Sequence, residues 1–174
     1  MVTTVTKKAT YADYEKTPEG AKYQLIEGQL IEMASPTLNH QEAALELAAQ
    51  ILLYCKQKKI GKIYIAPMDV YLDDENCYQP DIVFVSNENS VILQGKNIRG
   101  VPDMLIEILS ESSEHTDRKI KFHNYEKFGV KEYFIVDPED KEVIAYDLVD
   151  GFYKERYRKF GYVDSVVLGK RFDF

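Results

Sequence analysis

The chain has 174 residues and a mass of 20.1 kDa, a length that fits one domain spanning residues 1–174. Hydrophobic residues make up 45% of the sequence and charged residues 29%, a mixture that can build a packed core and excludes a disordered or fibrous chain. The formal net charge of −7 argues against a protein that coats nucleic acid through bulk positive charge.

The negative charge is concentrated in the middle of the chain. Between Asp69 and Asp117 there are 11 acidic and 2 basic residues, a net charge of −9, whereas the two flanking segments carry +1 each. Local basic clusters therefore stand beside an acidic centre. An acidic centre of this kind is compatible with a metal site, and it predicts weak binding to nucleic acid when metal is absent.

The sequence also limits the cellular setting. The first residues have no apolar run typical of a signal peptide, and no stretch approaches the length of a membrane span. Cys55 and Cys77 form neither a CxxC pair nor a disulfide framework, and three scattered histidines do not predict a zinc site. We expect a cytoplasmic protein with no membrane segment.

The first half of the chain predicts a short helix, a hairpin and one long helix. The short helix covers residues 10–16, and the N-terminal hairpin covers residues 23–34 with its turn at Glu27-Gly28. The long helix covers residues 40–58, with Asn39 as its N-cap. Its apolar positions fall on one face; they are Ala44, Leu47, Ala48, Ile51, Leu52 and Cys55.

The second half alternates strands with a further helix. We expect strands at 62–72 (broken near Pro67), 79–86, 101–110, 131–138 and 141–148, and short strands in the tail. Residues 73–78, including Cys77, are expected to form a polar loop, and residues 115–128 a helix that ends at Gly129. The pattern predicts a mixed α/β or α+β fold with a central mixed sheet flanked by helices.

Two of these strands contain a carboxylate within an apolar run. Asp81 begins the strand IVFV, and Glu107 lies within MLIEIL, which is otherwise free of polar side chains. A buried carboxylate requires a cation, a metal or a proton. The alternative is a carboxylate that points to solvent, which is a strong alternative for Asp81 and a weaker one for Glu107, since its strand is apolar on both faces.

The following helix offers a counter-charge. Asp117, Lys121 and Tyr125 are spaced i, i+4 and i+8 and share one stripe. Lys121 lies close enough in sequence to fold back over the end of the strand that carries Glu107. The alternative, which spacing alone favours, is a surface ion pair between Asp117 and Lys121.

Two carboxylates and a lysine are typical of a site for a hard cation with oxygen ligands. Mg²⁺ bound by Asp81 and Glu107 can activate water and neutralise charge during hydrolysis of a phosphodiester, and Mn²⁺ can replace it. Lys121 would orient the nucleophile or stabilise the transition state.

Several motifs in order then resemble a known family. They are EGQL at 27–30, His40 at the start of a long helix, QPDIVFV, VPDMLIEILSESSE, DRKIKFHNY and GVKEYFIVDP. This order is similar to that of the Uma-two family of restriction endonuclease-like proteins, within the PD-(D/E)xK nuclease superfamily. The resemblance covers residues 11–148.

The resemblance implies a restriction endonuclease-like fold with a mixed sheet of four to five strands, and a magnesium-dependent endonuclease, with DNA as the favoured nucleic acid and a homodimer as the assembly. Asp81 matches the aspartate of the PD motif and Glu107 the (D/E)xK acid, with Asp117 and Tyr125 as supporting residues. The sequence departs from the superfamily two residues after Glu107, where Leu109 replaces the lysine; Lys121 on the following helix is the matching residue.

Other residues leave alternatives open. The superfamily often adds an acid from the first long helix, for which Glu42 and Glu46 are candidates, while His40 is the family-like residue. A histidine at this place is more often a capping or packing residue. The tail alternates basic residues with aromatic ones; they are Tyr153, Lys154, Arg156, Tyr157, Arg158, Lys159 and Phe160. This alternation is typical of contacts with nucleic acid. It is also typical of a half-exposed strand, which is the slightly favoured interpretation.

Two other functions compete with nuclease activity. The first is a non-catalytic module that binds nucleic acid or supports assembly while it retains the nuclease fold, which the acidic isoelectric point and the displaced lysine favour. The second is a structural protein that associates through its aromatic tail.

Overall fold

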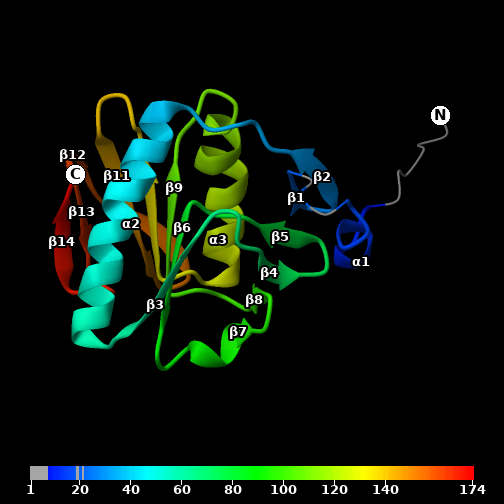
Figure 1. Ribbon diagram of the computed structural model, residues 1–174, viewed down its shortest axis with the longest axis horizontal. Helices are drawn as coiled ribbons and strands as arrows, with labels where there is room; N and C mark the ends of the chain where they lie inside the picture. Colours follow the sequence, from blue (N-terminus) through cyan, green and yellow to red (C-terminus); the bar gives the residue numbers. More distant parts are fainter. Residues whose placement is uncertain (1–7, 19, 21) are drawn as a thin grey trace.

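The computed structural model describes residues 8–18, 20 and 22–174 and has a mixed α+β architecture (Figure 1). Residues 1–7, 19 and 21 lie outside the described residues. Within the described part, the strands form two six-stranded sheets and one two-stranded sheet. None of the described helices combines the length and the apolar character that crossing a membrane requires.

The main sheet has the strand order β12-β11-β10-β9-β6-β3. Its strands are β3 (Gly61–Ile65), β6 (Ile82–Ser86), β9 (Met104–Ile108), β10 (Glu132–Val136), β11 (Glu142–Val149) and β12 (Phe152–Phe160). Strands β9 and β10 are parallel and the other neighbours are antiparallel. The sheet is therefore mixed as expected, with six strands instead of four to five because the long β11–β12 hairpin extends it.

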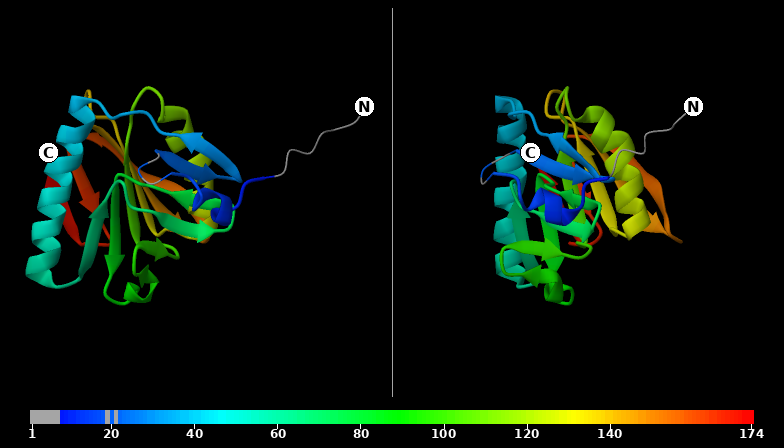
Figure 2. Two further views of the ribbon diagram at one scale, coloured as in Figure 1. Left: turned by 45° about the vertical axis from the view of Figure 1, so that its right-hand side comes forward. Right: turned by 90° about the vertical axis from the view of Figure 1, so that its right-hand side faces the viewer.

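Helices cover both faces of this sheet, as the turned view in Figure 2 shows. The apolar residues of β6 and β9 alternate between the two faces, so one face packs against α2 (Leu38–Lys58) and the C-terminal hairpin. The C-terminal hairpin consists of β13 (Tyr162–Ser165) and β14 (Lys170–Asp173). The opposite face packs against α3 (Phe122–Phe128) and the second sheet.

Helix α2 begins two residues earlier than the sequence pattern predicts. Its N-cap is Thr37 and not Asn39, because the Thr37 hydroxyl accepts a hydrogen bond from the His40 backbone N–H at 3.2 Å. The buried face also differs slightly from the expected one: Ala43 is buried, whereas Leu52 lies on the outer side of the helix.

The second sheet has the strand order β2-β1-β5-β4-β8-β7. Its strands are β1 (Tyr23–Ile26), β2 (Gln29–Glu32), β4 (Val70–Asp73), β5 (Asn76–Tyr78), β7 (Leu93–Gln94) and β8 (Asn97–Arg99). The N-terminal hairpin is thus confirmed. The expected polar loop at 73–78 is wrong, because β5 pairs with β1 and β4 and buries Cys77 completely.

Three short helical segments complete the chain. Helix α1 (Tyr11–Tyr14) begins with a capping box between Thr10 and Asp13, and η1 (Ser90–Ile92) precedes β7. The helix expected at 115–128 begins as η2 (Thr116–Lys121), a stretch of π-helix, and continues as α3. Gly129 ends it in the left-handed conformation, with φ of 92°.

Candidate functional site

The carboxylates predicted from the sequence lie at one end of the main sheet, beside the start of α2 and the segment η2 (Figure 1). Strands β6 and β9 pair antiparallel with Ile82 opposite Ile106, so the same register continued by one residue sets Asp81 opposite Glu107. The pairing also brings the Asp81 carboxylate to the Ile108 backbone N–H, which donates to Oδ2 at 2.7 Å.

Glu107 lies inside the molecule and is held by two side chains from the following helix. It is only 2% exposed. The Tyr125 hydroxyl donates to its Oε1 at 2.7 Å, and Lys121 Nζ lies 2.9 Å from the same atom. A carboxylate in this environment is stabilised only because a cation and a strong donor replace the lost water.

Lys121 bridges Glu107 to a second buried carboxylate. Its Nζ lies 2.8 Å from Oδ1 of Asp117, which is four residues earlier in the chain. The Lys121 side chain is 4% exposed and that of Asp117 is 1% exposed. The Tyr133 hydroxyl donates to the Asp117 carbonyl at 3.0 Å, which holds η2 against β10. The prediction of a surface ion pair, which spacing alone favours, is therefore wrong. The ion pair is buried because η2 packs the side that carries Asp117 and Lys121 against the sheet.

One cation and two carboxylates leave this buried cluster with an excess of negative charge. Burial raises the pKa of Glu107, and the nearby charges of Asp117 and Asp81 add to that rise, while Lys121 opposes it. Burial alone would lower the pKa of Lys121, yet the two carboxylates at its ammonium raise it. Lys121 is thus held as a cation between groups that compete for it.

His40 is the residue of the first long helix that reaches the site. Its Nε2 lies 3.3 Å from Asp81 Oδ2. Burial alone would lower the pKa of His40, but its hydrogen bond to Asp81 and the charge of that carboxylate raise it. Asp81 is the more accessible carboxylate of the two, with its side chain 17% exposed.

The other acids of α2 do not take part. Glu42 and Glu46 are exposed on the side of the helix that faces away from the sheet. A hydrogen-bond pair instead ties the start of α2 to the β10–β11 turn, because Asn39 Nδ2 donates to both carboxylate oxygens of Glu139 at 3.1 and 3.0 Å. This contact helps to hold His40 above the strand ends.

The basic tail forms the half-exposed strand β12. Arg156 pairs with Glu132 and Asp147, and Arg158 pairs with Glu142 and Glu155. These arginines therefore balance the charge of carboxylates on β10, β11 and β12 itself.

Two supporting residues had not been predicted from the sequence. Tyr133 positions η2 as described, and Asn124 Nδ2 donates to Glu27 Oε1 at 3.1 Å, which joins α3 to the turn of the N-terminal hairpin. For Tyr133 the sequence does contain an indication, because a tyrosine within a fully apolar strand needs a partner for its hydroxyl. For Asn124 no local pattern points to a partner almost a hundred residues away.

The donor set fits a hard divalent cation. In the described part of the chain, the hydrogen bonds and ion pairs to Asp81 and Glu107 reach Oδ2 and Oε1, so Oδ1 and Oε2 are the oxygens that could bind a cation. No three His, Cys, Asp or Glu side chains converge among residues 8–18, 20 and 22–174. Mg²⁺ commonly binds one or two carboxylates and keeps several waters, so two carboxylate oxygens suit it.

Comparisons with known proteins identify the family of the chain and a solved structure with a similar fold. A family model described as "Uma2: Putative restriction endonuclease" matches residues 9–165. The chain is 26% identical over 141 residues to "Uncharacterized protein sll1609" of Synechocystis sp., which covers 79% of each protein. It is also similar in fold to the crystal structure of "a putative nuclease belonging to DUF820" from Anabaena variabilis, with a TM-score of 0.70, 22% identity, and coverage of 84% of this chain and 83% of that chain.

Proposed function

Because the chain belongs to the Uma2 family, whose model is described as a restriction endonuclease, we propose that it is a magnesium-dependent endonuclease that hydrolyses phosphodiester bonds, with DNA as the favoured substrate. The observation that carries the proposal is the pairing of Asp81 and Glu107 on adjacent strands, with the buried Lys121 at 2.9 Å from Glu107. An acid–acid–lysine set of this kind suits phosphoryl chemistry.

Asp81 Oδ1 and Glu107 Oε2 would hold the Mg²⁺, or Mn²⁺ in its place. When bound, the cation would lower the pKa of a water molecule and neutralise charge on the phosphate. Tyr125 and Lys121 fix Glu107 through its other oxygen, so the oxygen left for the cation has a defined direction. The Ile108 N–H does the same for Asp81.

Lys121 would supply positive charge beside the reacting phosphate. Its ammonium is shared between Glu107 and Asp117, so Asp117 acts as a positioning residue that keeps the lysine at the strand end. The substrate would approach from the side of Asp81 and His40, since these side chains are more exposed than Glu107 and Lys121. His40 would stabilise negative charge on Asp81 and on the phosphate when protonated.

The alternative function is a non-catalytic module that binds nucleic acid or supports assembly. The observation that favours it is the nearly complete burial of Glu107 and Lys121, whose side chains are already satisfied by each other, Tyr125 and Asp117. Titration calorimetry with Mg²⁺ separates the two functions. The nuclease proposal requires uptake of Mg²⁺ that Asp81→Asn and Glu107→Gln abolish.

Cleavage of DNA with Mg²⁺ or Mn²⁺ tests the proposal directly. We expect the wild type to cleave and Glu107→Gln to lose at least about a hundredfold in rate, because the variant lacks a charged metal ligand. Asp103→Asn is the matched control: it removes a buried carboxylate at the other end of the same strand and should retain cleavage. Equal rates for wild type and Glu107→Gln would refute the assignment.

Metal should also control binding to nucleic acid. Without metal, the carboxylates at the strand ends repel phosphate, so we expect weak binding in EDTA and tighter binding of DNA in Ca²⁺, which occupies oxygen sites while often leaving the substrate uncleaved. Fluorescence anisotropy with labelled DNA measures this difference. Binding that is equally tight in EDTA would contradict a metal-centred site.

A further inference from the structure

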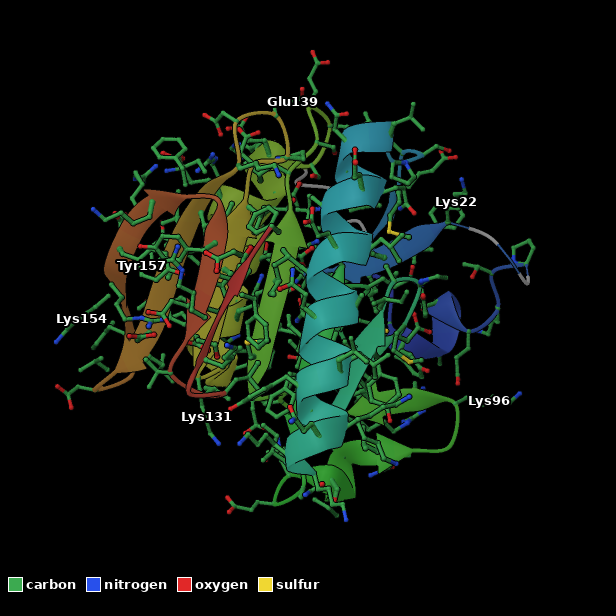
Figure 3. All side chains as sticks on the ribbon, turned by 60° about the vertical axis from the view of Figure 1, so that its left-hand side comes forward. Lys22, Lys96, Lys131, Glu139, Lys154 and Tyr157 are labelled. Atoms are coloured by element: carbon green, nitrogen blue, oxygen red, sulfur yellow. The ribbon has the colours of Figure 1, made fainter. Side chains whose placement is uncertain are left out.

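The outer side of α2 carries a regular stripe of mostly apolar side chains that no other part of the described chain covers. Figure 3 shows this helix in front of the main sheet, with its outer side toward solvent. The leucines are strongly exposed: Leu38 by 88%, Leu45 by 71%, Leu53 by 69% and Leu52 by 38%. The buried residues of α2 lie on the opposite side.

The spacing of the stripe is that of paired helices. Successive members are separated by four, three, four, three and four residues; they are Leu38, Glu42, Leu45, Ala49, Leu52 and Lys56. Scattered exposed leucines are ordinary, but leucines that repeat every seven residues, as Leu38, Leu45 and Leu52 do, are typical of a helix packed on another helix. Ala49 lies near the middle of the stripe, where a small side chain lets two helices approach closely.

The charges within the stripe select the partner and its direction. Glu42 lies toward the start of the helix and Lys56 toward its end, about 21 Å apart at 1.5 Å per residue. A parallel copy would bring Glu42 against Glu42 and Lys56 against Lys56. An antiparallel copy brings each Glu42 against a Lys56 and each Leu45 against a Leu53, so this face of α2 is complementary to itself under a two-fold axis.

We propose that α2 is the interface of a homodimer, in which the outer stripes of two copies pack antiparallel about a two-fold axis near Ala49. His40 lies on the buried side of the same helix, so this pairing leaves Asp81 and the strand ends uncovered. The inference concerns assembly and does not depend on nuclease activity.

Sedimentation velocity and light scattering across a concentration series test the interface. We expect the wild type to be a dimer, and Leu45→Glu to weaken dimerisation by at least about a hundredfold, because it places two charges in an apolar seam. Val91→Glu is the matched control, since Val91 is 78% exposed on η1, outside the stripe. Circular dichroism should show that both variants remain folded, because each replaces an exposed side chain.

Charge reversal tests the antiparallel direction. Glu42→Lys and Lys56→Glu should each weaken the dimer by about tenfold, since every dimer contains two such pairs. The double variant Glu42→Lys/Lys56→Glu should recover the wild-type affinity. A wild type that stays monomeric throughout, a dimer unaffected by Leu45→Glu, or a double variant that is not rescued would each overturn the proposal.

Discussion

Strand β9 carries a buried carboxylate near each end, and the two are held in opposite ways. Asp103, just before the strand, accepts hydrogen bonds from the Ser86 N–H and Asn89 Nδ2 and pairs with Lys131 at 2.6 Å. Glu107, near the other end, accepts a hydrogen bond from the Tyr125 hydroxyl and shares the Lys121 ammonium with Asp117. Figure 3 labels Lys131 and Glu139, which mark these two ends of the main sheet.

The two carboxylates differ in how far their neighbours offset the effect of burial on the pKa. Burial alone would raise the pKa of Asp103, yet Lys131 and the donors around it lower the value. Burial raises the pKa of Glu107, and its neighbours do not fully compensate. Near-complete burial is therefore shared by both residues, and the balance of donors and charges distinguishes a structural role from a candidate functional one.

The largest expected effect comes from removing Lys121, the cation at the Glu107 end. Lys121→Met leaves two buried carboxylates without a counter-charge and should lower the free energy of unfolding by about 3–5 kcal/mol at neutral pH. Lys131→Met is the matched control and should cost less than about 1 kcal/mol, because that side chain is 65% exposed and Asp103 keeps its other donors. Urea unfolding measures both values, and equal losses would remove the proposed contrast.

A smaller loss is expected from truncation of the stabilising carboxylate. Asp103→Ala leaves the Ser86 N–H without its side-chain acceptor and the Asn89 amide with only the Val101 carbonyl, which should cost about 2–3 kcal/mol. Nuclease activity per folded molecule should be unchanged, because this end of β9 lies away from Asp81 and Glu107. A variant that is stable but inactive would show that Asp103 belongs to the functional site.

The sequence predicts the carboxylates and the lysine because their local patterns are distinctive. Glu107 is the one polar side chain in an apolar strand, and Asp117, Lys121 and Tyr125 recur at helical spacing. Whether Lys121 forms a surface ion pair with Asp117 or reaches the buried Glu107 depends on how η2 packs against the sheet. That packing depends on contacts between distant segments, such as the hydrogen bond of the Tyr133 hydroxyl to the Asp117 carbonyl.

Contacts between segments that are distant in sequence could not be predicted from local patterns. His40 meets Asp81 only because the start of α2 lies beside the strand ends, so spacing along the chain could not separate it from the acids of the same helix. Strands β5, β7 and β8 of the second sheet have only two or three residues, too few to show a periodic pattern, and Cys77 of β5 is consequently buried where a polar loop is expected.

Removal of the Tyr125 hydroxyl should affect the Glu107 end of β9 only modestly. Tyr125→Phe deletes the donor to Glu107 Oε1 but keeps the ring among its aromatic neighbours, so the expected cost is about 1–1.5 kcal/mol. Because Tyr125 positions a proposed metal ligand, calorimetry should also show weaker uptake of Mg²⁺. Tyr133→Phe, which loses a hydroxyl bond to a backbone carbonyl, is the control and should change stability more than Mg²⁺ affinity.

The smallest effect, and the sharpest test of the contrast, is the dependence of stability on pH. The pKa of Asp103 is lowered in the folded chain, so its stabilisation is present above the ordinary value of 3.8 and is lost as the pH falls below it. The pKa of Glu107 is raised, so the folded chain binds that proton more tightly, and its ionisation costs stability as the pH rises above 4.5. With increasing pH, Asp103→Asn should become less stable relative to the wild type, and Glu107→Gln more stable. Urea unfolding in EDTA from about pH 3 to about pH 9 measures both differences; slopes of the same sign would mean that the two ends of β9 hold their carboxylates alike.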